Sequence, residues 1–410
     1  MATQTAAERP TGRFQPALLG SAFVAAIAYV DPGNVAANLT AGAQYGYLLV
    51  WVLVAANAMA VLIQFLSAKL GLVTGRSLPE LIGERLRRWP RLAYWVQAEL
   101  VAAATDLAEV IGGALALWIL FGVPLPLGGL IVGAVSMALL SVQSRRGQRP
   151  FEFVVIGLLA IITIGFGVGL LFSPVDWSAA AGGLVPRFED TQTVLLAASM
   201  LGATVMPHAI YLHSSLARDR HGRHRGGSLR NLLKATRWDV LLSLAVAGTV
   251  NIAMLLLAAS SLGGVAGTDT IEGAHAAISS ALGPAIGVIF GIGLLASGLA
   301  STSVGCYAGA AIMSGLLKVR IPLLARRAIT LVPALATLAI GVDPTWALVI
   351  SQVLLSIGIP FAVIPLVKLT SDRILMGDFV NPAWVRIVAW SVVSAIVALN
   401  VALLALTLTG

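Results

Sequence analysis

The sequence predicts an all-α polytopic membrane protein, and three observations support that prediction. Of the 410 residues, 58% are hydrophobic and only 11% are charged, whereas a soluble domain carries about 25% charged residues. About eleven apolar stretches are long enough to cross a bilayer, and the basic residues lie on one side of them. This composition excludes a soluble enzyme and a disordered chain. The single cysteine, Cys306, excludes a disulfide framework and a cysteine-rich zinc module.

The apolar stretches have the length of transmembrane helices, roughly 17–25 residues for a hydrocarbon core about 30 Å thick. The N-terminal segment is short and polar and has no small-residue cleavage site after an apolar core. We therefore expect the first span itself to insert the chain. In chain order, the stretches centre near Ala26, Met59, Leu107, Gly133, Ile161, Met200, Val250, Gly293, Leu335, Ser356 and Ser394.

The distribution of basic residues predicts the orientation of these spans. With a cytoplasmic N-terminus, all of the 26 Lys and Arg except Arg187 fall in cytoplasmic segments, as the positive-inside rule expects. The net charge of +8 therefore indicates topology and contact with the lipid bilayer, and no nucleic-acid partner is expected. The prediction is a multi-pass protein of the inner (plasma) membrane with an external C-terminus and no evident obligate protein partner.

Two helix breaks suggest an internal duplication. Asp31-Pro32-Gly33-Asn34 interrupts the first span and Met206-Pro207 the sixth, so a second five-helix unit would lie inverted relative to the first. Inverted repeats with paired broken helices recur in secondary transporters, which hold substrate at the membrane midplane between the breaks. The predicted division is a cytoplasmic tail at 1–16, a first repeat at 17–172, an external loop at 173–191, a second repeat at 192–368, and a connection with the eleventh helix at 369–410.

The first break carries the groups of a cation site. Pro32 removes a backbone donor, so carbonyls such as that of Ala28 lose their helical partner. Free carbonyls persist at membrane depth only beside a cavity, a ligand or other protein. Asp31 adds a carboxylate and Asn34 an amide next to them. The alternative is an ordinary turn at the membrane interface, which the apolar sequence on both sides of the break disfavours.

The second break adds a softer set of groups. Pro207 frees the carbonyl of Ala203 in the same way, Met206 offers a thioether, and His208 offers an imidazole. Alone, this methionine would be read as a packing residue and the histidine as plain polar lining. Paired with the first break, the mixture of hard and soft ligands disfavours Mg²⁺ and Ca²⁺ and favours later divalent metals such as Mn²⁺, Fe²⁺, Co²⁺ or Cd²⁺.

Two acids lie deep inside the third span. Asp106 and Glu109 are three residues apart, which places both on one helix face. An ionisable group at this depth is a functional candidate by default, and two neighbouring carboxylates in a low dielectric do not both ionise easily. This arrangement suits a proton relay, with a hydrogen-bonded structural pair as the alternative. Glu99 is expected on the same face nearer the cytoplasm. Gln352, in a later apolar run, fits a ligand role and a packing role equally.

These motifs resemble the Nramp (natural resistance-associated macrophage protein) divalent-metal transporters, and most closely their bacterial proton-coupled manganese branch. The paired signatures are Asp31-Pro32-Gly33-Asn34 and Met206-Pro207-His208. The likeness extends from roughly Ala17 to Pro365. It includes Ala68-Lys69-Leu70-Gly71, Ala104-Thr105-Asp106-Leu107-Ala108-Glu109, Tyr211-Leu212-His213-Ser214 and Ser351-Gln352-Val353.

The resemblance implies a LeuT-like fold of two inverted five-helix repeats plus an eleventh helix, with the first and sixth helices unwound mid-membrane. It implies that the transported metal is bound by Asp31, Asn34, Met206, the carbonyls of Ala28 and Ala203 and, in some states, Gln352. The implied proton route contains Asp31, His208, Asp106 and Glu109, with Arg326 or Arg327 on a polar path toward the cytoplasm. The chain departs from the family pattern at Ala209 and Leu299, where polar residues are common.

The sequence therefore predicts a proton-coupled secondary transporter that imports divalent transition metal ions by alternating access, with Mn²⁺ first and Fe²⁺ second. No P-loop, dinucleotide fingerprint or nucleophile elbow is present, so we expect neither enzyme activity nor a cofactor. One alternative is a cation-coupled amino-acid symporter of the same fold, which would need backbone donors for a substrate carboxylate at the breaks. The other alternative is a passive metal channel.

Overall fold

The computed structural model describes residues 21–146, 148–221, 227–265, 267–268, 270–319 and 321–409. The tail predicted at 1–16 lies outside the described residues. The helices are α1 (Ser21–Ile27), η2 (Ala28–Val30), α2 (Pro32–Tyr45), α3 (Val50–Thr74), α4 (Leu78–Arg85), α5 (Arg88–Phe121), α6 (Leu125–Arg146), α7 (Gln148–Leu171), α8 (Trp177–Gly182), α9 (Thr191–Thr204), α10 (Pro207–His221), α11 (Gly227–Ser261), α12 (Ile271–Leu282), α13 (Pro284–Leu317), α14 (Leu323–Ile340), α15 (Pro344–Thr370), α16 (Arg373–Met376), η3 (Gly377–Phe379) and α17 (Ala383–Thr409).

Every apolar stretch predicted from the sequence coincides with a helix. The first corresponds to α1, η2 and α2, the sixth to α9 and α10, and the others to α3, α5, α6, α7, α11, α13, α14, α15 and α17. In the part of the chain that the structure describes, eight helical segments are long and apolar enough to cross a membrane. The predicted all-α polytopic fold is confirmed.

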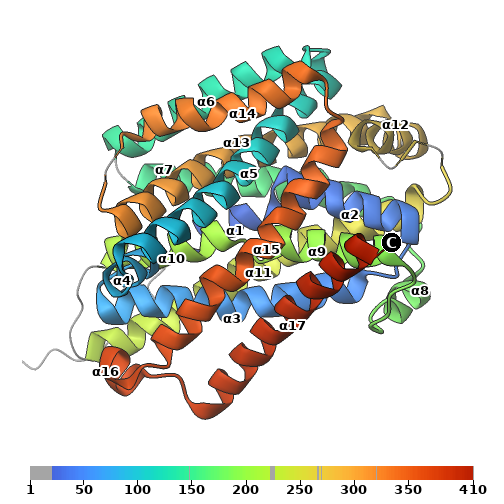
Figure 1. The fold of residues 1–410 in the computed structure, drawn as a ribbon. Helices are drawn as coiled ribbons and strands as arrows, with labels where there is room; N and C mark the ends of the chain where they lie inside the picture. The colour runs from blue at the N-terminus through green and yellow to red at the C-terminus, as the bar shows by residue number, and fades with distance from the viewer. Residues whose placement is uncertain are drawn as a thin grey trace, which may run out of the picture.

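The two split helices lie in the middle of the bundle (Figure 1). Around them, α13 packs along α5 and α7, α15 along α9 and α5, and α11 along α2 and α3. On one side α6 and α14 pack against each other, and on the other side α17 packs against α15 and α9. Small residues allow these close contacts, because a Cβ on Gly298 of α13 would lie 2.8 Å from the Cα of Gly113 in α5.

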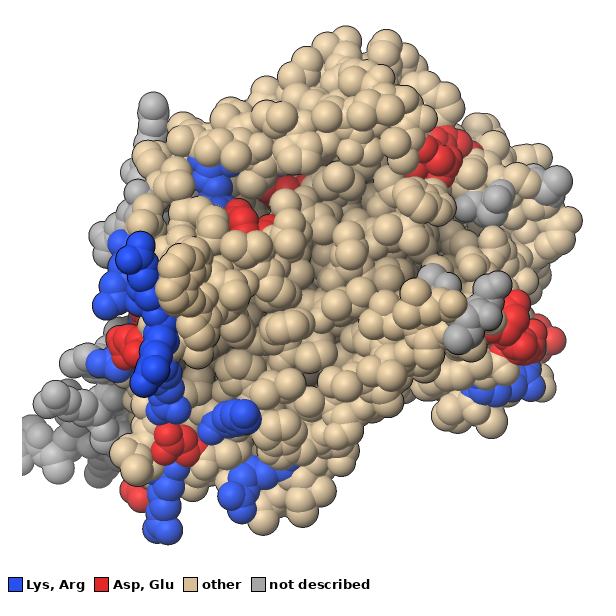
Figure 2. Space-filling model, viewed as in Figure 1, with Lys and Arg blue, Asp and Glu red and all other residues tan. Residues whose placement is uncertain are grey.

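Lysine and arginine side chains gather at the end of the molecule where α4 and α16 lie (Figure 2). Ion pairs connect separate segments there, with Arg85 3.0 Å from Asp372 and Arg218 2.5 Å from Glu80. The hydrogen bond from Arg85 lowers the pKa of the Asp372 carboxyl. The short helices α8 and α12 lie at the opposite end (Figure 1). The structure thus has one strongly basic end, which is the asymmetry on which the predicted orientation rests.

Candidate metal site

The first helix break is built around an extended residue between two helical segments. Asp31 has φ −85° and ψ 169°, which ends η2 and caps α2. Its Oδ1 accepts hydrogen bonds from the backbone N–H and from the side-chain Nδ2 of Asn34, each at 2.8 Å. Because Pro32 has no N–H, it cannot donate to the carbonyl of Ala28 four residues before it. Asp31 and Asn34 are both completely buried.

The second break meets the first through one side-chain amide. Helix α9 ends at Thr204, Val205 forms the turn, and α10 begins at Pro207. The carbonyl of Ala203, which Pro207 leaves without its helical donor, accepts a 2.9 Å hydrogen bond from Asn34 Nδ2. Met206 lies in this turn and is completely buried. A single amide therefore joins the Asp31 carboxylate of one broken helix to the freed carbonyl of the other.

Gln352 of α15 is the third element at this junction. Its Nε2 lies 3.5 Å from Asp31 Oδ2 and 3.2 Å from Ser351 Oγ. A Cβ on Gly33 would overlap the Gln352 side chain, so the missing side chain at position 33 lets Gln352 approach the carboxylate. The side-chain amide oxygens Gln352 Oε1 and Asn34 Oδ1 are buried and have no hydrogen-bond partner among the described residues. Buried acceptors without a donor are costly, and a bound cation would satisfy both.

Residues that the sequence analysis did not assign to the site hold the unwound turn in place. Asn251 Nδ2 of α11 donates to the Tyr29 carbonyl at 2.7 Å, and Ser297 Oγ of α13 donates to the Val30 carbonyl at 2.6 Å. Asn38 of α2 in turn donates to Asn251 Oδ1 at 3.1 Å. In the sequence, only Asn251 could have been noticed, as a polar residue within an apolar helix. Ser297 gave no signal, because a serine in a helix usually bonds to the backbone of its own helix.

The predicted acidic pair lies on the inner face of α5 and meets α14. Asp106 and Glu109 are buried, and Arg327 NH1 lies 3.3 Å from Asp106 Oδ1. Arg327 is completely buried and also donates from Nε to Ser136 Oγ of α6 at 2.8 Å. Both carboxylate oxygens of Glu109 have no hydrogen-bond partner among the described side chains and backbone. The Asp106 carboxyl is within hydrogen-bonding range of Glu109 when one of the two acids carries a proton, and Asp31 and Arg327 are within electrostatic range.

His208 lies between the second break and the acidic face. Its Nδ1 is 3.3 Å from Thr105 Oγ1, and that hydroxyl donates to the Val101 carbonyl at 3.0 Å. When Thr105 donates its hydroxyl proton to Val101, the contact requires the proton on His208 Nδ1; when the hydroxyl points to His208, Nδ1 is the acceptor. The other nitrogen, Nε2, is buried and has no partner in the described part of the chain. Thr105 is the residue next to Asp106, so the imidazole reaches the beginning of the acidic face.

The two neighbouring arginines of α14 serve different carboxylates. Arg326 forms a two-pronged pair with Glu99, with NH2 to Oε1 at 2.6 Å and NH1 to Oε2 at 3.2 Å, whereas Arg327 pairs with Asp106. The Glu99 side chain is 24% exposed and that of Asp106 only 3% exposed. The structure thus places both predicted arginines on the face of Glu99, Asp106 and Glu109, with Arg326 at its more exposed end.

The donor types at the helix breaks suit a transported metal better than a permanently bound one. Among the described residues, no group of three or more His, Cys, Asp and Glu side chains is arranged to hold a metal ion. The two breaks and Gln352 instead bring together one carboxylate, two amide side chains and the Ala203 carbonyl, and Met206 in the second break carries a thioether. Ligands of this mixed hardness fit divalent transition metals better than Mg²⁺.

Comparisons with known proteins identify the family of this chain. The family described as natural resistance-associated macrophage protein-like (Nramp) matches residues 22–406. The divalent metal cation transporter MntH of Mycobacterium tuberculosis is 61% identical over 394 residues, covering 96% of this chain and 92% of that protein. The MntH of Klebsiella pneumoniae is 46% identical over 400 residues, covering 97% and 96% of the two chains.

Solved structures agree with this assignment. A manganese transporter of Eremococcus coleocola, crystallised with an aromatic bis-isothiourea compound, has a TM-score of 0.85 at 30% identity, covering 96% of this chain and 87% of that one. MhsT, solved with L-phenylalanine, has a TM-score of 0.61 at 16% identity, covering 95% and 97% of the two chains; this second likeness concerns the fold alone. By sequence along nearly its whole length, this chain belongs to the Nramp family.

Proposed function

We propose that this protein is a divalent metal cation transporter that imports Mn²⁺, and secondarily Fe²⁺, together with protons by alternating access. The observation that supports it best is the Asn34 amide, which joins the Asp31 carboxylate of the first broken helix to the Ala203 carbonyl of the second. The named activities of the MntH relatives point the same way. Membership in this family makes an enzyme activity unexpected.

In this proposal the metal binds at the junction of the two breaks. Asp31 supplies the negative charge, and the unpartnered oxygens of Asn34 and Gln352 supply neutral donors. Ala28 and Ala203 contribute backbone carbonyls, of which the second is held by Asn34 before the metal arrives. Met206 adds the soft ligand that discriminates against Mg²⁺ and Ca²⁺. A metal ion would therefore replace the hydrogen bonds between Asn34 and its two acceptors.

Protons would travel along a separate route that begins at the same carboxylate. A cation arriving at Asp31 favours the ionised form of that side chain, so a proton held there is released toward His208 and the face of Asp106 and Glu109. Arg327 lies against Asp106 and Arg326 against Glu99, which continues this polar path along α5 and α14. The route would end at the basic end of the molecule (Figure 2), which we assign to the cytoplasm.

Alternating access would use the two breaks as hinges. The helical backbone is interrupted at Asp31 and at Val205, so the two halves of each broken helix can tilt relative to each other. The division into inverted repeats at 17–172 and 192–368 gives each break the same place in its own repeat. An amino-acid substrate is disfavoured, because the side chain facing the junction is a carboxylate and the N–H of Asn34 is already used by it.

The decisive experiment is metal uptake by the purified protein in proteoliposomes with an imposed pH gradient. We expect saturable uptake of Mn²⁺, Fe²⁺, Co²⁺ and Cd²⁺ that is faster with an acidic exterior and acidifies the interior, and little uptake of Mg²⁺ or Ca²⁺. Liposomes without protein and vesicles with equal pH on both sides are the controls. Uptake that does not saturate would indicate a channel, and uptake of labelled amino acids without metal would indicate a symporter.

A further inference from the structure

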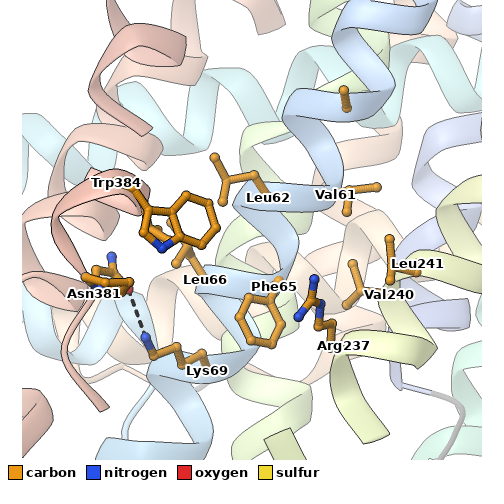
Figure 3. A pocket seen from close by; sticks show the side chains of 13 residues that line it. Val61, Leu62, Phe65, Leu66, Lys69, Arg237, Val240, Leu241, Asn381 and Trp384 are labelled. Carbon is orange, nitrogen blue, oxygen red and sulfur yellow. Dashed lines mark hydrogen bonds between the residues drawn. The ribbon is translucent and has the colours of Figure 1, made fainter. Parts of the chain in front are cut away.

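A groove that none of the residues of the helix breaks lines opens on the outer surface of the bundle between α3, α11 and the start of α17 (Figure 3). Its volume is about 370 Å³. The α3 side is a stripe with helical spacing that runs from Ala58 through Leu62 and Phe65 to Lys69. Ala58 and Trp384 are exposed, so the groove faces the surroundings of the protein and not its interior.

Two cationic side chains lie at one end of this groove, and neither has a carboxylate partner among the described residues. Lys69 Nζ donates to Asn381 Oδ1 at 2.8 Å, which uses one of its three N–H donors. Arg237 extends from α11 on the opposite wall, with Phe65 between the two in the view of Figure 3. An anion bridging them would gain charge-assisted hydrogen bonds from both walls.

The position of these cations along the bundle matches the level of phospholipid headgroups. Lys69 lies five residues before the end of α3 at Thr74, and Trp384 is the second residue of α17. Both therefore belong to the basic end of the molecule, where tryptophan is typical of the membrane interface. The apolar remainder of the groove, from Phe65 back to Ala58, runs from this level toward the middle of the membrane.

We infer that the groove is a binding site for an anionic phospholipid, independent of the proposed transport site. The phosphate would lie at the end of the groove that carries Lys69 and Arg237, and one acyl chain would follow the stripe of Leu62 and Phe65 against Leu241. Basic pockets between transmembrane helices on the cytoplasmic side are the usual form of such sites. A free phosphate ion would leave most of the groove unfilled, which is why a lipid fits better.

The site also explains how α17 is attached to the rest of the bundle at this end. Asn381, the acceptor for Lys69, lies just before α17 and is itself held by Thr370 of α15, through its backbone N–H at 3.0 Å and its Nδ2 at 2.8 Å. A lipid bridging α3 and α11 beside Trp384 would close the remaining gap between these helices and α17. Bound lipid should therefore stabilise the folded protein by mass action.

Native mass spectrometry of the delipidated full-length protein tests this inference. Titration with phosphatidylglycerol and with phosphatidylcholine of the same acyl chains should show preferential binding of the anionic lipid. The double substitution K69Q/R237Q should weaken phosphatidylglycerol binding by about thirtyfold, since a basic side chain near the membrane surface contributes about 1 kcal/mol. The matched control K368Q/R373Q removes the same charge at the same end outside the groove and should leave binding unchanged.

A second variant tests the acyl-chain half without changing charge. Ala58→Trp fills the exposed far end of the groove and should weaken the binding of both lipids. In nanodiscs, phosphatidylglycerol should raise the thermal unfolding midpoint of the unmodified protein and of K368Q/R373Q, but not that of K69Q/R237Q. Equal binding of the two lipids, equal losses in both double variants, or displacement by inorganic phosphate alone would each overturn the inference. Metal uptake that fails while lipid binding persists would count against the proposed function only.

Discussion

Two buried polar regions lie next to each other in this molecule, and they are built in opposite ways. At the helix breaks, the Asp31 carboxylate has short hydrogen bonds from Asn34, and a contact with Gln352 at 3.5 Å. On the acidic face of α5, both oxygens of Glu109 have no hydrogen-bond partner among the described residues. The first region is formed by the interrupted backbone, and the second by side chains of three helices, α5, α6 and α14.

This difference indicates two tasks. At the helix breaks, hydrogen bonds already orient the carboxylate and the amides beside it. Such a group of side chains is suited to coordinate a metal ion, because little reorganisation is needed when the ion binds. A carboxyl group that lies beside a second acid and a guanidinium is suited to exchange a proton, because the neighbouring Asp106 and Arg327 favour opposite protonation states of Glu109. The comparison therefore predicts different defects: substitutions at the helix breaks should weaken metal binding, and substitutions on the acidic face of α5 should weaken proton coupling.

The largest expected effect is at Asp31. Asp31→Asn keeps the shape and removes the only full charge at the junction, so metal affinity should fall by about a thousandfold, given that a contact between unit charges is worth about 4 kcal/mol at an effective dielectric of about 20. Isothermal titration calorimetry with Mn²⁺ and proteoliposome uptake measure the loss. Asp176→Asn, at the N-terminal cap of the exposed helix α8, is the matched control and should behave like the unmodified protein.

The sequence predicted the helix breaks, which are formed by the backbone, more fully than the acidic face, which is formed by side chains of separate helices. Both breaks were predictable because a proline removes its own donor at a known position, as the Ala203 carbonyl and the cap at Asp31 illustrate. The number and position of the spans followed from hydropathy. On the acidic face, the family resemblance implied Arg326 or Arg327 on the path. It did not show which carboxylate each arginine meets, or that Ser136 holds Arg327, because only the packing of separate helices brings these residues together. The residues chosen as metal ligands stay a prediction.

The next largest effect concerns folding stability and separates the two arginines of α14. Arg327→Gln leaves Asp106 buried without its cation, which should cost about 3–5 kcal/mol of stability. Arg326→Gln, whose partner Glu99 is partly exposed, should cost roughly 1–2 kcal/mol. Thermal unfolding in the same detergent compares them directly. Equal unfolding midpoints for the two variants would show that the buried Arg327–Asp106 pair contributes no more to stability than the partly exposed Arg326–Glu99 pair.

A smaller and more selective effect is expected at Glu109. Glu109→Gln has nearly the same shape and removes only the ability to carry a proton. Metal-dependent acidification of proteoliposomes should fall by at least about tenfold, while Mn²⁺ affinity measured by calorimetry stays close to that of the unmodified protein. A parallel loss of affinity and acidification would mean that the two regions act as one site, and the distinction between them would fail.

The smallest effect is at Met206, within the junction itself. Met206→Ala removes the thioether and leaves the carboxylate, the amides and the carbonyls in place, so Mn²⁺ uptake should persist at a reduced rate. Because the remaining ligands are all oxygens, which Ca²⁺ and Mg²⁺ prefer, competition by these ions should increase, on the order of tenfold in their inhibition constants. Uptake of ⁵⁴Mn²⁺ against increasing Ca²⁺ and Mg²⁺ gives this ratio.

Met200→Ala is the matched control for that experiment. Met200 lies in α9, a turn and a half before Met206, and is equally buried in the apolar core. It therefore reports the cost of losing a packed methionine without losing a ligand. If both variants change selectivity to the same extent, Met206 acts through packing; if only Met206→Ala admits Ca²⁺, the soft ligand sets the preference of the junction.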